Sequence, residues 1–246
     1  MRHATVVDSD EATVFDALTH AHDSPYCVKL ELFCRVAGIP YYKPLWTRPE
    51  VVPPRSKEII DQLERDGVTI DSDAVEREAR RISVACDELY FAMLYSTWNV
   101  NWRGTRARYF DKGLRGCLRS RRARRRVLKA LRDHGIVNAQ PDDVVRDAKR
   151  LVDDLATALG DHQTFFDTPK LTTADVSAYA MLDCFAYGDL DHNPVGDYVK
   201  TKPTLMAFLA RVANQYFPTA HRAPRQHLHL KPVKAVRIRT WEEYYS

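Results

Sequence analysis

Residues 24–27, Ser-Pro-Tyr-Cys, are the part of the sequence whose residue types and spacing best suit chemistry. Ser24 is a good helix N-cap, because its hydroxyl can accept hydrogen bonds from the free N–H groups of the first turn, and Pro25 fits the first helical position. Gly38 and Pro40 then end the predicted helix. A hydroxyl and the positive end of a helix dipole therefore meet at one point, which suits a thiolate or another anion. An ordinary capped helix without a ligand is the alternative.

Cysteine usage and hydropathy predict a protein of a reducing compartment. The five cysteines form no CxxC pair and no paired framework, which is typical of the cytoplasm. Cys27 and Cys34 are seven residues apart on one face of the predicted helix, and we expect both to pack. We expect no signal peptide, and no apolar run is long enough to span a membrane. The expectation is a cytoplasmic protein with no integral membrane segment and no metal site.

The phrase from Ser24 to Tyr41 resembles the first strand–loop–helix of glutathione-transferase-like proteins, whose N-terminal half has a thioredoxin-type fold. It is most similar to the metaxin and failed-axon-connections branch, in which Ser-Pro-Phe/Tyr-Cys precedes a Lys-rich helix and a Gly-Ile-Pro-Tyr turn. The resemblance implies that the Ser24 hydroxyl faces the glutathione sulfur and that Tyr26 and Cys27 belong to the same binding site. A glutaredoxin-like Cys-Pro-Tyr-Cys has cysteine where Ser24 stands, so we expect no thiol–disulfide exchange here.

The resemblance has a break after this turn. The family continues with a strand, a helix, a loop ending in a cis-proline, a hairpin and an acidic-Ser step, whereas only residues 43–55 are present here. So short a segment cannot hold those elements, because strands alone need about five residues each. The resemblance makes Pro53 or Pro54 the remnant of the proline beside the cysteinyl part of glutathione, and Ser56 a ligand of its γ-glutamyl end. Arg55 replaces the acid of that step and cannot accept from the γ-glutamyl ammonium, so we expect weak glutathione binding.

Past residue 70 the sequence predicts helices almost throughout. A segment with apolar residues at a 3.6-residue period follows the capping residues 71–73. The polar and aromatic stretch Tyr95–Trp102 comes next, and in related proteins such a stretch faces the cleft between the two domains. We favour core or interdomain packing as the role of Trp98 and Trp102.

Arg115–Arg132 is a strongly basic segment that contains nine Lys or Arg residues. The apolar residues among them recur at helical spacing, which favours an amphipathic helix with a solvated basic face; they are Leu114, Leu118, Val127, Leu128 and Leu131. A nucleic-acid or acidic-membrane surface is the alternative. The net charge of +4 is too small to imply a nucleic-acid partner, and we expect none.

Thr172 and Asp175 have the spacing of a capping box, in which each side chain bonds the backbone N–H of the other residue, and Leu171 is placed as a hydrophobic staple. The surrounding sequence from Phe165 to Tyr179 resembles the buried core helix of the glutathione-transferase C-terminal domain. There the box supports folding rather than chemistry.

These observations predict an α+β, mostly α fold: a reduced thioredoxin-like domain over residues 1–66 packed on an all-α domain over 71–217, followed by a basic tail, 218–246. Part of 233–241 is predicted to pack on the N-terminal domain as a strand, with a mobile tail as the alternative. Two functions stay open. One is a glutathione-transferase-like enzyme in which Ser24 activates glutathione, the co-substrate, toward a small electrophile. The other is a non-catalytic interaction protein of the metaxin type, with a protein partner. The chain can form a homodimer or stay a monomer, and the sequence leaves both open.

Overall fold

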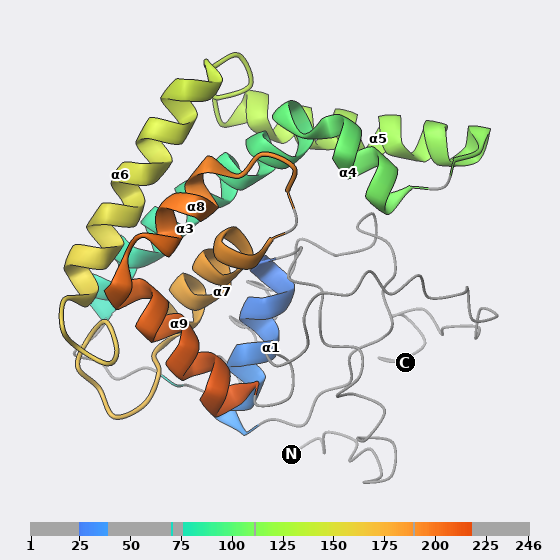
Figure 1. Cartoon of the computed structure of the whole chain (residues 1–246). Coiled ribbons are helices and arrows are strands. Elements are labelled where there is room, and N and C mark those ends of the chain that lie inside the picture. The colour runs from blue at the N-terminus through green and yellow to red at the C-terminus, as the bar shows by residue number, and fades with distance from the viewer. Residues whose placement is uncertain (1–24, 39–69, 71–75, 111, 189, 218–246) are drawn as a thin grey trace, which may run out of the picture.

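The computed structural model describes residues 25–38, 70, 76–110, 112–188 and 190–217. Within these ranges every regular element is a helix (Figure 1). The helices are α1 (Pro25–Ala37), α3 (Glu76–Tyr95), the π-helix η3 (Ser96–Val100), α4 (Trp102–Tyr109), α5 (Leu114–Asp133), α6 (Pro141–Leu159), α7 (Thr173–Tyr187), α8 (Pro194–Lys200) and α9 (Pro203–Tyr216). The mostly helical architecture agrees with the expectation for residues 71–217. Of the predicted thioredoxin-like domain only α1 is described, and the predicted strand at 233–241 lies outside the described residues.

Helix α7 is the centre of the helical body. Its residues from Ala174 to Ala186 are all buried, and α1, α3, α8 and α9 pack around it (Figure 1). A helix buried on all sides must be mostly apolar, and its polar groups need internal partners. One of them, the Ser177 hydroxyl, donates to the Thr173 carbonyl at 2.8 Å.

The capping box at the start of α7 is present as predicted. The fully buried Asp175 carboxylate accepts hydrogen bonds from the Thr172 backbone N–H and the Phe165 backbone N–H, both at 2.8 Å, and from the Thr172 hydroxyl at 2.6 Å. The Asp175 N–H donates in return to the Thr172 hydroxyl oxygen at 3.3 Å. The loop before α7 is thereby tied to the first turn of the helix.

Helix α1 has the boundaries that its sequence predicts. It begins at Pro25 and ends before Gly38, whose φ of 67° lies in the left-handed region that favours glycine. Its Arg35 pairs with the buried Glu31 at 3.0 Å and donates to the Tyr216 carbonyl at the end of α9 at 2.7 Å. The same guanidinium lies 4.7 Å from the centre of the Phe217 ring. These contacts join α1 to α9, in addition to its packing on α7.

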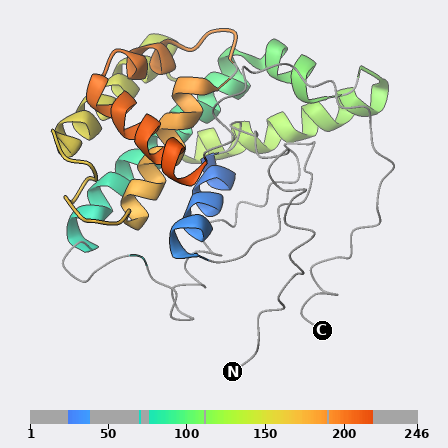
Figure 2. The ribbon, with the colours of Figure 1, turned by 60° about the horizontal axis from the view of Figure 1, so that its bottom comes forward.

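The apolar residues of α5 are only partly buried, which differs from a uniformly amphipathic helix. Leu131 is fully buried, whereas Leu114 and Leu118 are 78% and 59% exposed. Helix α5 packs against α3 and η3, and Figure 2 shows it extending away from the helices around α7. Of the face that the helical spacing predicts, the C-terminal end is buried at Leu131, whereas the N-terminal end is exposed at Leu114 and Leu118.

Replacing Asp175 by alanine is expected to destabilise the helical body strongly. The variant leaves two buried backbone donors without their acceptor, which costs about 2–4 kcal/mol of unfolding free energy. Urea denaturation of Asp175→Ala measures this loss. Asp154→Ala, which removes an exposed carboxylate from α6, is the matched control and is expected to change little. Equal effects of the two variants would contradict the role given to the box.

Candidate functional site

The N-terminal end of α1 is the place where the sequence predicts a glutathione site. Ser24, Pro53 and Ser56 lie outside the described residues, as does the side chain of Cys27. Their roles therefore stay predictions.

Tyr26 is the predicted site residue whose side chain is described, and it contacts α3. Its ring centre lies 4.5 Å from that of Tyr90, with the two rings at 69°. Burial is the main cause that raises the pKa of the Tyr26 phenol far above its ordinary value, and it raises the pKa of Tyr90 to about 12. Both phenols are neutral at physiological pH and pack against each other. The role of Tyr26 in binding glutathione stays a prediction beside this packing contact.

The buried cysteines are poor nucleophiles. Burial raises the pKa of Cys34 to about 11 and that of Cys86 to about 12. The thiolate is the reactive form, so these thiols are inert at neutral pH. The expectation that Cys34 packs in the core is confirmed. Among the described residues no group of three or more His, Cys, Asp or Glu side chains could hold a metal ion.

A helical irregularity joins α3 to α4. The π-helix η3 buries Trp98, and π-turns inside helices occur frequently at functional sites. Asn101, the residue after the end of η3, is buried, and its side chain pairs with the backbone of His192 in the loop before α8. Its Nδ2 donates to the His192 carbonyl at 2.9 Å, and its Oδ1 accepts from the His192 N–H at 3.0 Å. The break between η3 and α4 is therefore held by a contact with a segment 91 residues away.

The two tryptophans of this junction form a platform for an arginine of α5. The Trp98 and Trp102 ring centres lie 5.9 Å apart at an interplanar angle of 27°. The Arg124 guanidinium lies 5.0 Å from the centre of the Trp102 ring, and its Nε donates to the Trp98 carbonyl at 3.1 Å. Cation–π contact and the hydrogen bond together hold this arginine in place.

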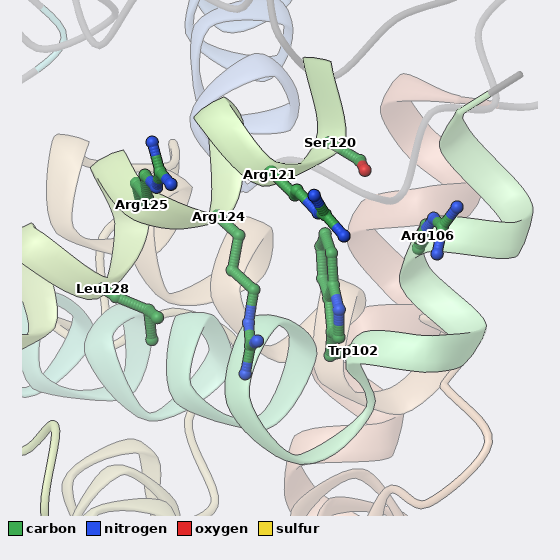
Figure 3. A pocket seen from close by; sticks show the side chains of 7 residues that line it. All are labelled: Trp102, Arg106, Ser120, Arg121, Arg124, Arg125 and Leu128. Carbon is green, nitrogen blue, oxygen red and sulfur yellow. The ribbon is translucent and has the colours of Figure 1, made fainter. Parts of the chain in front are cut away.

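Next to this platform is a pocket of about 270 Å³ between α4 and α5, which we call the arginine pocket (Figure 3). Four of its seven lining side chains are arginines, and none is acidic. The pocket is lined by Trp102, Arg106, Ser120, Arg121, Arg124, Arg125 and Leu128. Its lining therefore concentrates positive charge around a cavity.

Sequence reasoning found the parts of this pocket but not their connection. The sequence predicts packing for the tryptophans of the stretch 95–102 and a solvated face for the basic run 115–132. Trp98 is buried, which confirms packing for that residue. Two features of the sequence could have indicated the pocket. One is Asn101, a polar residue without an obvious local role, which the structure buries. The other is the spacing of residues 121, 124, 125 and 128, which places them along one face of α5.

Comparison with known protein families finds a similarity in the second half of the helical body. Residues 148–212 match the glutathione S-transferase C-terminal domain. The matched segment runs from α6 through α7 and α8 into α9 and contains the capping box of α7. It supports a place in the glutathione S-transferase-like superfamily. No curated protein and no solved structure matches the chain significantly. In the described part, no helix is long and apolar enough to cross a membrane.

The buried thiols are expected to resist alkylation in the native protein. At pH 8, iodoacetamide should modify Cys34 and Cys86 far more slowly than the half-buried Cys117, because their raised pKa values leave almost no thiolate. Peptide mass spectrometry after timed quenching measures the rates.

The raised pKa of Cys86 also predicts a pH dependence of stability. The folded state retains the Cys86 proton at pH values above the ordinary thiol pKa of 9.0, so the unfolding free energy should fall as pH rises past about 9. Rapid labelling of Cys86 by iodoacetamide in the native protein would contradict the raised pKa on which both expectations rest.

Asn101→Ala is expected to loosen the junction between η3 and α4. It removes both side-chain bonds to His192, each worth about 0.5–1.5 kcal/mol, so the expected total loss is about 1–3 kcal/mol. Thermal melting should show the loss. Asn99→Ala is the control. Asn99 lies two residues before Asn101, and its side-chain amide forms no hydrogen bond with the described part of the chain. A similar melting temperature for both variants would contradict the role of Asn101.

Proposed function

We propose that the chain is a glutathione S-transferase-like protein that binds glutathione weakly at the N-terminal end of α1. The observation that carries this proposal is the match of residues 148–212 to the transferase C-terminal domain. The position of α1 supports it, because this helix begins at Pro25 and packs on α7, which lies within the matched segment. Ser24 would donate a hydrogen bond to the glutathione thiolate, which lowers the thiol pKa and favours attack on an electrophile.

The binding is weak because part of the predicted site has changed. Arg55 stands where the resembling family has an acid next to Ser56. Each lost charge-assisted hydrogen bond is worth roughly 1.5–3 kcal/mol, so two lost bonds weaken affinity by more than about a hundredfold. Thiol transfer to an electrophile is at most slow under these conditions.

A non-catalytic interaction protein of the metaxin type is the second candidate. The short segment 43–55 favours it, because the elements that complete a glutathione site in the resembling family do not fit there. For this candidate we also propose a cytoplasmic location, a homodimer and a protein partner.

Glutathione at 1–20 mM is expected to raise the melting temperature of the full chain by a small amount, as for a ligand bound only to the native state. Ser24→Ala should remove the increase and Ser24→Thr, which keeps a hydroxyl, should retain it. Arg55→Glu restores the acid before Ser56 and should enlarge the increase, with tighter binding by calorimetry. S-methylglutathione, which cannot form a thiolate, is the matched ligand control and should be insensitive to Ser24→Ala.

The outcomes separate the two candidates. A stabilising effect of glutathione that depends on Ser24 and grows with Arg55→Glu supports the transferase-like function, and conjugation of an aryl halide then measures its rate. No stabilisation of the wild-type protein or of Arg55→Glu contradicts glutathione binding and favours the interaction protein.

A further inference from the structure

The arginine pocket between α4 and α5 has the features of an anion site. We propose that it binds a small phosphate monoester, through Arg106, Arg121 and Arg124, at a place separate from the glutathione site proposed above. The pocket volume of about 270 Å³ is near the lower end of the range of small-ligand pockets, roughly 300–1,000 Å³. The size suits one phosphate group with a short organic substituent.

The arginines of the pocket come from two helices, and two of them, Arg121 and Arg124, lie against Trp102 (Figure 3). Trp102 and Arg106 are four residues apart on α4 and so share a face. Figure 3 shows the Arg121 guanidinium of α5 pointing toward Trp102, whereas Arg125 points away from it. The main ligand contacts are therefore assigned to Arg106 and Arg121, and a supporting contact to Arg124.

None of the residues that line the pocket is acidic, and the described acid Asp191 lines the adjoining pocket together with Trp102 and Arg124. Within the described part of the chain, Arg106 and Arg121 form no ion pair, whereas Arg108 of α4 lies 3.7 Å from Asp191 and Lys129 of α5 lies 2.6 Å from Asp133. Cations held together without a counter-charge repel one another, so a bound anion lowers the electrostatic energy. A phosphate monoester carries up to two negative charges and offers three oxygens to guanidinium groups, which bind phosphate in a bidentate way.

Arg124 is pre-organised for this role. Its Nε is occupied by the Trp98 carbonyl at 3.1 Å, and the guanidinium plane is held over the Trp102 ring. The two terminal nitrogens keep their donors for an acceptor in the pocket. Less side-chain entropy is lost on binding when an arginine is already held in position.

The other lining residues favour an ester over inorganic phosphate. The Ser120 hydroxyl donates to the Cys117 carbonyl at 2.8 Å, so its proton is not available to the ligand. Trp102 and Leu128 provide an apolar wall beside the arginines. An organic group attached to the phosphate can cover this wall, which inorganic phosphate leaves in contact with water.

The phosphate monoester can belong to a free metabolite or to a lipid headgroup, and the two sources share the chemistry that the pocket recognises. Phenyl phosphate represents the first source. Vesicles of phosphatidylcholine with phosphatidic acid, whose headgroup is a phosphate monoester, represent the second, and pure phosphatidylcholine vesicles are their control. Calorimetry with phenyl phosphate and vesicle co-sedimentation, both with the full chain at low salt, measure binding.

Arg121→Gln and Arg106→Gln are expected to weaken phosphate-monoester binding by about tenfold or more. Arg122→Gln is the matched control, because it removes the same charge from the next position of α5. Arg122 is exposed, as Arg106 and Arg121 are, but it does not line the pocket. Its Kd should change less than about twofold. Phenyl phosphate should bind more tightly than inorganic phosphate or sulfate.

Binding of either source that is lost in Arg121→Gln and kept in Arg122→Gln supports the pocket, and the arm that shows it identifies the source. Equal loss in the two variants overturns it, because general charge attraction does not distinguish neighbouring arginines. Absence of binding in both arms overturns it, and so does tight binding of a DNA or RNA duplex that phenyl phosphate does not displace. Each result is independent of whether glutathione binds, since the glutathione test uses different variants.

Discussion

The hydrogen bonds of the buried Asp175 carboxylate determine where α7 begins, and four of the other described helices, α1, α3, α8 and α9, pack on α7. A carboxylate can be buried only when charge-assisted hydrogen bonds replace its water, and here two backbone N–H groups and the Thr172 hydroxyl do so. Because Phe165 is one of the donors, the loop from α6 is fixed by the same group. The register of α7 against α1, α3, α8 and α9 then follows from one capping interaction.

A continuous series of contacts leads from α7 to the arginine pocket. At the C-terminal end of α7, the Phe185 carbonyl accepts from Asn193, whose side chain also caps α8 by accepting from the Gly196 N–H at 2.9 Å. A side chain at Gly196 would collide with that same Phe185 carbonyl, so the close approach of α8 to α7 requires glycine there. The neighbouring His192 binds Asn101, and Asn101 starts the helix that carries Trp102. The pocket therefore depends on the packing of the core, although α5 itself extends away from it.

Local sequence signals predicted the helix boundaries well, because those signals act within a single turn. Pro25 and Gly38 begin and end α1 as their φ preferences require, and the box of Thr172 and Asp175 begins α7. The π-turn of η3 was not predictable in this way, since it is supported by the pairing of Asn101 with a distant loop. The placement of Arg124 on Trp102 is equally non-local. The other basic residues of the run 115–132 are exposed, as the prediction of a solvated face expects. The predicted glutathione site rests on resemblance, because most of its residues lie outside the described part.

The two proposed ligand sites contact α3 and its continuation at separate places. Tyr26, at the predicted glutathione end of α1, packs on Tyr90, whereas the arginine pocket begins beyond η3, which starts six residues later. Six residues of helix correspond to about 9 Å. A ligand bound to the arginines at Trp102 therefore leaves the Tyr26 contact intact, and any energetic coupling between the sites has to pass through the packing of α3. The transferase-like body can in this way carry a second recognition surface on α4 and α5 without altering the helices that match the transferase domain.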